Sequence, residues 1–369
     1  MDRFKTVIFF TILLAFFSAN SFAGSSIFKI PLHQKWVTKL KKEKAITRRP
    51  YQFATVLVDN SVIYAGSAGG QFYALDTKKG NKVWHTKLLG GVYAEPIIDE
   101  DNVFVADRKG IVYALNKESG TIEWQVETGM EISAKPLVVD DTIYLATALR
   151  QIVAVDKLGR GKKWQTVKTG ALPKMTLKGT SSPVYYNGNI YVGYADGLFV
   201  CYKAQDGSVI WSKQLANKSA SFTDVDTTPL IYDNVIYISS ADGKTFALNP
   251  SNGDAVWTIE RGGANDLATD WTDLYISSGF GKLSAVSLKS GNLIWEQEFE
   301  GSELSSPSVK DGLIVLTATR DKIYVVNAKT GDIEYKRFLG KRSFGRPVID
   351  GDTVYILTNS SSLFALQGS

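Results

Sequence analysis

The chain is poor in the side chains that most often catalyse reactions or bind metals. Its 369 residues contain one cysteine, Cys201, and two histidines, His33 and His85. A single cysteine excludes a disulfide within the chain. Both histidines lie close to a tryptophan, Trp36 or Trp84, in segments typical of strands whose side chains face neighbouring strands or solvent. We therefore expect neither a zinc site nor a Ser-His-Asp triad.

Long apolar runs and a strong net charge are missing as well. The formal net charge is +5, which is too small for a chain of this length to indicate a nucleic-acid partner. The apolar run Val7–Phe17 follows Arg3 and Lys5 and is too short to span a membrane. Because Ser21-Phe22-Ala23 ends this run with small residues, we expect residues 1–23 to be a cleavable signal for export to the periplasm or exterior.

What the chain does have is a repeating pattern of short strands and turns. The pattern is complete in Pro229–Trp257, where four apolar, β-branched runs are separated by three turns. The turns contain Asp233-Asn234, Asp242-Gly243 and Asn252-Gly253, residue types that tolerate the positive φ of tight hairpins. This stretch predicts one four-stranded antiparallel sheet.

The pattern recurs along the chain, which indicates a repeat architecture. In seven copies a second-strand residue is followed 20 positions later by an outer-strand aromatic: Tyr64/Trp84, Phe104/Trp124, Tyr144/Trp164, Tyr191/Trp211, Tyr237/Trp257, Tyr275/Trp295 and Val315/Tyr335. A first-strand marker, proline in most copies, lies 8 positions before each second-strand residue: Val56, Pro96, Pro136, Pro183, Pro229, Leu267 and Pro307. Pro347 and Tyr355 begin an eighth copy, whose own outer strand would fall beyond Ser369.

The missing outer strand has a candidate near the start of the chain. Gln34–Thr38, around Trp36, has the pattern of an outer strand but is not preceded by the three other strands of a repeat. Pairing it with the last hairpins would close a ring and leave no open edge. We therefore predict an all-β protein, a single eight-bladed β-propeller over residues 24–369 with four-stranded antiparallel blades, in which residues 34–38 form the outer strand of the last blade.

Two kinds of repeated position have a structural interpretation. The outer tryptophans are predicted to be packing anchors between neighbouring blades, because each buries a large ring. Cys201 takes the position that Ala74 and Ala114 occupy in other copies, so it is predicted to be a small buried side chain.

The segment Ala74–Trp84, with its copies, resembles the tryptophan-docked repeats of the pyrroloquinoline quinone (PQQ) propellers. That superfamily contains dehydrogenases, which carry PQQ with calcium, and non-enzymatic members. The dehydrogenases are much longer and use adjacent cysteines beside the cofactor, whereas this chain has one cysteine and no matching calcium-and-base set. We therefore expect no cofactor, with a PQQ-dependent oxidoreductase as the alternative.

A narrower resemblance lies in Asp224–Pro229, read Asp-Val-Asp-Thr-Thr-Pro, and in Met175–Gly179, read Met-Thr-Leu-Lys-Gly. Both segments are similar to the BamB family, the propeller subunits of the machinery that assembles β-barrel proteins in the bacterial outer membrane. The resemblance implies a non-enzymatic periplasmic scaffold that is peripheral to the outer membrane. Its implied partner is a BamA-like subunit, and unfolded outer-membrane proteins are a second implied class of partner. A propeller that binds another envelope component remains an alternative. Family members commonly carry a lipidated cysteine directly after the signal, where this chain has Gly24, so we expect membrane association through a partner.

Connection lengths point to the same two segments. From outer aromatic to next first-strand marker, four connections take 12 positions, but Trp36 to Val56 takes 20, Trp164 to Pro183 takes 19 and Trp211 to Pro229 takes 18. Since spacing within the repeats is constant, the extra residues must emerge on one face, where loops on a rigid scaffold commonly bind partners. The first long connection also carries basic residues that suit either a solvated loop or an acidic surface: Lys39, Lys41, Lys42, Lys44, Arg48 and Arg49.

The other two long connections flank the fourth repeat and would be neighbours in space. The resemblance places Met175, Leu177 and Lys178 on the family's partner-docking loop, and Asp224 and Asp226 on its acidic counterpart. Exposed Met and Leu would provide an apolar anchor, and the charged residues would provide orientation. Where the family has arginine, Lys178 lacks the bidentate guanidinium. The alternative is that the two aspartates accept backbone N–H bonds in an Asx-type turn.

Overall fold

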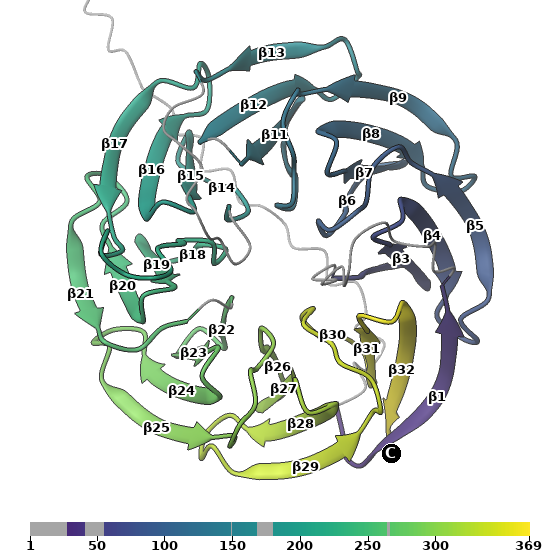
Figure 1. Ribbon diagram of the computed structural model, residues 1–369, viewed down its shortest axis with the longest axis vertical. Coiled ribbons are helices and arrows are strands. Elements are labelled where there is room, and N and C mark those ends of the chain that lie inside the picture. Colours follow the sequence, from purple (N-terminus) through teal and green to yellow (C-terminus); the bar gives the residue numbers. More distant parts are fainter. Residues whose placement is uncertain (1–27, 41–54, 149, 168–179, 264–265) are drawn as a thin grey trace, which may run out of the picture.

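Four-stranded antiparallel sheets make up the whole described structure. The computed structural model describes residues 28–40, 55–148, 150–167, 180–263 and 266–369, and these contain strands but no helix. Eight sheets stand around a common axis in a closed ring (Figure 1). The predicted eight-bladed β-propeller is therefore confirmed. We number the blades 1–8 in the order of their innermost strands.

Each blade contributes an inner, a second, a third and an outer strand, ordered from the axis outward (Figure 1). The inner strands are β2 (Leu57–Asp59), β6 (Ile97–Asp99), β10 (Leu137–Val139), β14 (Val184–Tyr186), β18 (Leu230–Tyr232), β22 (Leu267–Thr269), β26 (Ser308–Lys310) and β30 (Val348–Asp350). The second strands are β3 (Val62–Gly66), β7 (Asn102–Ala106), β11 (Thr142–Thr147), β15 (Asn189–Gly193), β19 (Val235–Ser240), β23 (Asp273–Ser277), β27 (Leu313–Ala318) and β31 (Thr353–Leu357). The third strands are β4 (Gln71–Asp76), β8 (Ile111–Asn116), β12 (Gln151–Asp156), β16 (Leu198–Lys203), β20 (Lys244–Leu248), β24 (Lys282–Ser287), β28 (Lys322–Asn327) and β32 (Ser362–Gly368). The outer strands are β5 (Lys82–Lys87), β9 (Ile122–Glu127), β13 (Lys162–Gln165), β17 (Val209–Gln214), β21 (Ala255–Ile259), β25 (Leu293–Glu298), β29 (Ile333–Phe338) and, for blade 8, β1 (Leu32–Lys39).

Tight turns set the register inside each blade. In blade 5, Asp233 and Asn234 adopt φ values of 48° and 58° between β18 and β19, and Gly253 adopts 73° between β20 and β21. Positive φ at both central residues suits the two-residue hairpins that match strand twist. Because strands alternate in direction, these two turns lie at one end of the blade, which we call the hairpin face. The remaining turns and the connections between blades lie at the other end, the connection face.

The core lies between neighbouring blades. Second and third strands are almost entirely buried; for example, Tyr191 and Phe199 of blade 4 pack with Ile236 and Phe246 of blade 5. Outer strands alternate exposed and half-buried side chains, as expected when one face of a strand is covered. Cys201 is fully buried in this core and burial raises the pKa of its thiol to about 11, which confirms the prediction of a small buried side chain.

Each outer tryptophan docks on the next blade. The Trp84 Nε1 donates to the Lys117 carbonyl over 3.0 Å, and its ring covers Gly120, where φ is +72° and a Cβ would overlap the indole. Equivalent Nε1 bonds run from Trp36, Trp211, Trp257 and Trp295 to the carbonyls of Thr77, Pro250, Leu288 and Ala328. The glycines covered in this way are Gly80, Gly120, Gly159, Gly207, Gly253, Gly291 and Gly331. The prediction that the tryptophans anchor neighbouring blades is confirmed.

The ring closes through the strand predicted from the start of the chain. β1 pairs antiparallel with β32, with Trp36 opposite Ala365 and Val37 opposite Phe364 (Figure 1). At the seam between blades 7 and 8 the Tyr335 hydroxyl donates to the Leu32 carbonyl over 2.9 Å. The last blade therefore combines both ends of the chain, as expected. The predicted signal, residues 1–23, lies outside the described residues.

Candidate partner-binding site

The connection between β17 and β18, residues 215–229, is the long connection that the structure describes in full. Its counterpart between β5 and β6 covers only residues 88–96. Met175, Leu177 and Lys178, which belong to the preceding long connection, lie outside the described residues, as do the basic residues after Leu40. The geometry of the candidate site therefore comes from the segment that contains Asp224 and Asp226.

Backbone hydrogen bonds hold this connection against the second-to-third-strand turns of blades 4 and 5. The Val225 N–H donates to the Tyr194 carbonyl over 3.0 Å, and the Ala241 N–H donates to the Asp224 carbonyl over 2.8 Å. The Thr227 hydroxyl accepts from the Ser239 N–H over 3.0 Å. Val225 is fully buried in the core shared by the two blades. The segment is thus a fixed part of the propeller.

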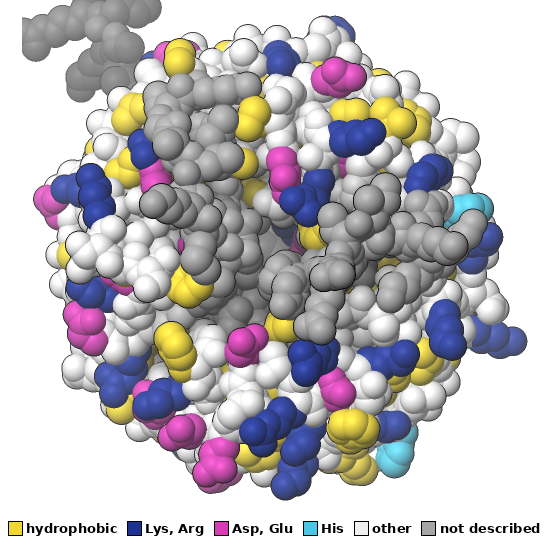
Figure 2. Space-filling view, viewed as in Figure 1, with side chains coloured by type: hydrophobic (Ala, Val, Ile, Leu, Met, Phe, Trp, Pro, Cys, Tyr) yellow, Lys and Arg dark blue, Asp and Glu magenta, His cyan; other side chains and the backbone are white. Residues whose placement is uncertain are grey.

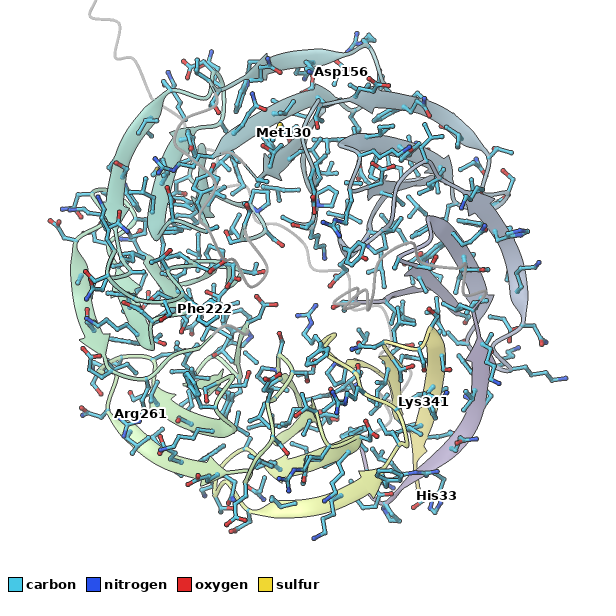
Figure 3. The ribbon with its side chains drawn as sticks, viewed as in Figure 1. His33, Met130, Asp156, Phe222, Arg261 and Lys341 are labelled. Atoms are coloured by element: carbon cyan, nitrogen blue, oxygen red, sulfur yellow. The ribbon has the colours of Figure 1, made fainter. Side chains whose placement is uncertain are left out.

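Both aspartates of the predicted site point inward. Asp224 is 0% exposed and Asp226 is 3% exposed. A buried carboxylate needs hydrogen-bond donors within the protein and does not present its charge to a partner in that position. The connection instead exposes Asn217, Lys218 and Ser219, and Phe222, labelled in Figure 3, is half-buried.

Phe222 and Lys218 were missed by sequence reasoning. They precede the Asp-Val-Asp-Thr-Thr-Pro segment and have no special spacing, so the repeat gave them no weight. Their position in the longest described connection is the signal that could have found them. An exposed cation and a half-buried aromatic ring on one connection can contribute orientation and an apolar contact to a protein interface.

Polar residues just before the inner strands form a second feature of the connection face, which we call the inner rim: Glu95, Lys135, Ser182, Thr228, Asp266, Ser306 and Arg346. Glu95 accepts from Lys135 over 2.6 Å and from Arg346 over 3.0 Å, which links blades 2, 3 and 8. The Thr228 N–H donates to the Asp266 carboxylate over 2.8 Å. The inner rim therefore ties blades together near the axis by polar contacts.

A buried pair of tyrosines lies next to the connection of residues 215–229. The Tyr194 and Tyr202 hydroxyls share a buried hydrogen bond of 3.0 Å, and burial raises the pKa of both. Such hydroxyls stay protonated at neutral pH. Within the described ranges, no group of three or more His, Cys, Asp or Glu side chains is placed to hold a metal ion. Figure 2 shows basic and acidic side chains interspersed on the viewed face.

Comparison with known proteins decides the family. The family model described as "Outer membrane protein assembly factor BamB" matches residues 33–131, 87–278 and 241–369. The chain belongs to the BamB family. Resemblance in Asp224–Pro229 and Met175–Gly179 had suggested this family, and the match confirms it across nearly all of the propeller.

Individual relatives in and around the BamB family are distant. The outer membrane protein assembly factor BamB of Alkalilimnicola ehrlichii is 26% identical over 203 residues, which is 53% of this chain and 53% of that protein. The alignment thus spans about half the length of this curated relative. In the described ranges, no helix is long and apolar enough to cross a membrane.

Solved structures similar to the chain share its fold. The crystal structure of BamB from Moraxella catarrhalis superimposes with a TM-score of 0.78 at 18% identity, over 91% of this chain and 100% of that one. A quinohemoprotein alcohol dehydrogenase from Pseudomonas putida HK5 gives a TM-score of 0.71 at 13% identity, over 91% of this chain and 76% of that one. At these identities the likeness establishes the propeller and carries no information on activity.

Proposed function

We propose that this BamB-family propeller is a non-enzymatic periplasmic scaffold in the assembly of outer-membrane β-barrel proteins, and that it binds a BamA-like subunit through its connection face. The observation that carries this is the family match over almost the whole propeller. The name of that family refers to outer membrane protein assembly. A rigid ring with long connections on one face suits a protein whose role is binding.

The docking surface we propose combines the two long connections that flank blade 4. Leu177, with Met175 beside it, would supply the apolar anchor, and Lys178 and Lys218 would supply charge at its edge. Asp224 and Asp226 would not contact the partner themselves. Their buried carboxylates lie in the segment that is hydrogen-bonded to Tyr194 and Ala241. In this proposal the aspartates orient the connection, and the neighbouring exposed side chains make the contacts.

Co-purification from an envelope extract tests the proposal. Leu177→Ala should abolish recovery of the BamA-like subunit while the melting curve stays that of the parent. Phe280→Ala is the matched control, since Phe280 is 84% exposed on the same face but lies in blade 6. That variant should retain the subunit. Recovery unchanged by Leu177→Ala would count against the proposed surface.

The aspartates need a separate measurement. Asp226→Ala should reduce co-purification and also lower the melting temperature, since it empties a buried polar position. A variant that loses the partner without any change in melting would show that Asp226 contacts the partner directly. Incubation of the parent with PQQ and calcium, followed by a dye-reduction assay with alcohols, should give no activity; turnover would overturn the non-enzymatic proposal.

A further inference from the structure

Trp271 is the tryptophan that the repeat does not explain. The other seven tryptophans lie on outer strands, but Trp271 lies between β22 and β23 on the hairpin face of blade 6. Its side chain is 55% exposed and its φ is 71°. A bulky residue in the left-handed region is rare and strained, and such strain persists where the surroundings hold it. Trp271 therefore exposes a large apolar ring to water and also carries backbone strain.

Side-chain hydrogen bonds hold the Trp271 turn in place. The Asp270 carboxylate accepts from the backbone N–H groups of Thr272 and Asp273 over 3.0 and 2.8 Å, and from the Tyr275 hydroxyl over 2.8 Å. The Thr269 hydroxyl oxygen accepts from the Trp271 N–H over 2.9 Å. These bonds restrain the backbone on both sides of Trp271, so the direction in which its side chain leaves the turn is fixed. A preorganised ring loses little entropy when it binds.

A second exposed ring lies beside the indole. Tyr232, at the end of β18 in blade 5, is 42% exposed, and its ring centroid is 5.2 Å from that of Trp271 with an interplanar angle of 34°. We call Tyr232 and Trp271 the aromatic platform. The adjacent Asn234 accepts from the Tyr186 hydroxyl of blade 4 over 3.3 Å, which connects the platform to a third blade.

The inner turns that carry the platform are acidic, with Asp233 and Asp270, although the third-to-outer-strand turns of the same face carry lysines such as Lys289. The turns between inner and second strands are residues 60–61, 100–101, 140–141, 187–188, 233–234, 270–272, 311–312 and 351–352. Together these turns contain eight acidic residues and neither Lys nor Arg: Glu100, Asp101, Asp140, Asp141, Asp233, Asp270, Asp311 and Asp352. Some are engaged; Lys163, for example, pairs with Asp141 over 2.7 Å. Asp233, directly after Tyr232, is exposed.

We propose that the aromatic platform is a docking site for a basic polypeptide segment, in which an arginine side chain stacks on Trp271 and Tyr232 while Asp233 and the neighbouring inner turns attract its charge. Aromatic faces bind cations, Trp most strongly, and the planar guanidinium can also stack on them. A neutral ligand such as a sugar would use the rings but would gain nothing from the acidic turns. The site lies on the hairpin face, so it can be occupied together with a partner on the connection face.

Peptide binding to a chain of residues 24–369 tests this proposal. The probe is a fluorescein-labelled peptide of repeated Arg-Gly-Ser units, with a matched peptide in which Glu replaces Arg. We expect the Arg peptide to bind more tightly at low salt and to weaken as salt rises. Trp271→Gly should weaken it about fivefold or more, the effect of losing a cation-π contact of about 1 kcal/mol. Asp233→Asn should weaken it less and reduce its salt dependence.

Trp271→Gly separates binding from folding, because glycine accepts the left-handed backbone without strain. Its melting temperature should match or exceed that of the parent. Trp271→Phe should restore part of the affinity, and Phe280→Ala on the opposite face should leave it unchanged. The proposal is overturned if the Arg peptide does not bind the parent, if the Glu peptide binds equally well, or if Trp271→Gly binds like the parent.

Discussion

Neighbouring blades are joined both at the outer wall, which consists of the outer strands and their tryptophans, and at the inner rim. The two regions join the blades by different kinds of contact. At the wall, tryptophan covers a left-handed glycine of the next blade at seven interfaces, from Gly80 to Gly331. At the rim, side chains differ from blade to blade, and an ion pair such as Glu95–Arg346 reaches past blade 1. The wall buries large apolar rings, whereas the rim exchanges hydration for polar contacts. We infer that the wall provides most of the stability and that the rim is free to vary.

Removing one complete section of the wall should have the largest effect. A chain that starts at residue 41 lacks β1 and Trp36, so β32 becomes an open edge. Loss of a buried tryptophan alone costs roughly 3–5 kcal/mol. We expect the melting temperature to fall by about 10 °C or more, with aggregation visible by size-exclusion chromatography.

The control for this truncation is a chain that starts at residue 28 and keeps β1. It should melt like the parent. Equal melting of the two truncated chains would mean that β1 does not close the ring in solution.

A single methyl group placed in the wall should have the next largest effect. Gly120→Ala puts a Cβ against the Trp84 ring. Gly129→Ala is a matched control, because Gly129 also has a positive φ, 86°, but nothing within 4 Å of the added Cβ. In both variants the left-handed backbone should lower the free energy of unfolding by about 1 kcal/mol. Only Gly120→Ala adds a steric clash, which should lower it by about 1–3 kcal/mol more. Chemical denaturation measures the difference, and equal losses would show that the indole moves aside freely.

The smallest effect is expected at the inner rim. Arg346→Ala removes one ion pair, but Glu95 keeps Lys135 at 2.6 Å, and the Arg346 side chain is 41% exposed. Exposed ion pairs contribute about 0–1 kcal/mol. The loss of stability should stay below that of Gly120→Ala and shrink further in high salt. A loss as large as that of the wall variant would reverse our ranking of wall and rim.

Much of each blade, including the outer wall, could be predicted from residues close together in sequence. The positive-φ turns at Asp233-Asn234 and Gly253, the constant spacing from Tyr237 to Trp257 and the outer strand around Trp36 all depend on local backbone preference and alternation. The same pattern recurs in every blade, so a strand that is poorly marked in one copy can be assigned from the other copies. The outer strand of the eighth blade could be predicted because a closed ring leaves no strand edge unpaired.

The candidate site was less predictable than the wall. Sequence reasoning singled out the connection of residues 215–229 by its length, which the structure confirms, and its Asp-Val-Asp-Thr-Thr-Pro segment suggested the family. It did not predict that Asp224 and Asp226 would be buried, because burial there depends on turns of blades 4 and 5 that lie up to 30 residues from Asp224 along the chain, such as the Tyr194 carbonyl.

Sequence alone therefore determined the strands, their number and the closure of the ring, since each follows from turn chemistry and a repeated spacing. Only the tertiary structure decided which polar and aromatic side chains meet. Glu95 and Arg346 are 251 residues apart, and Tyr232 and Trp271 come from different blades, yet each pair is in contact. No local preference specifies such pairs, because they form only when a closed ring brings distant turns to the same face. The proposed functions of this propeller depend on contacts of that second kind.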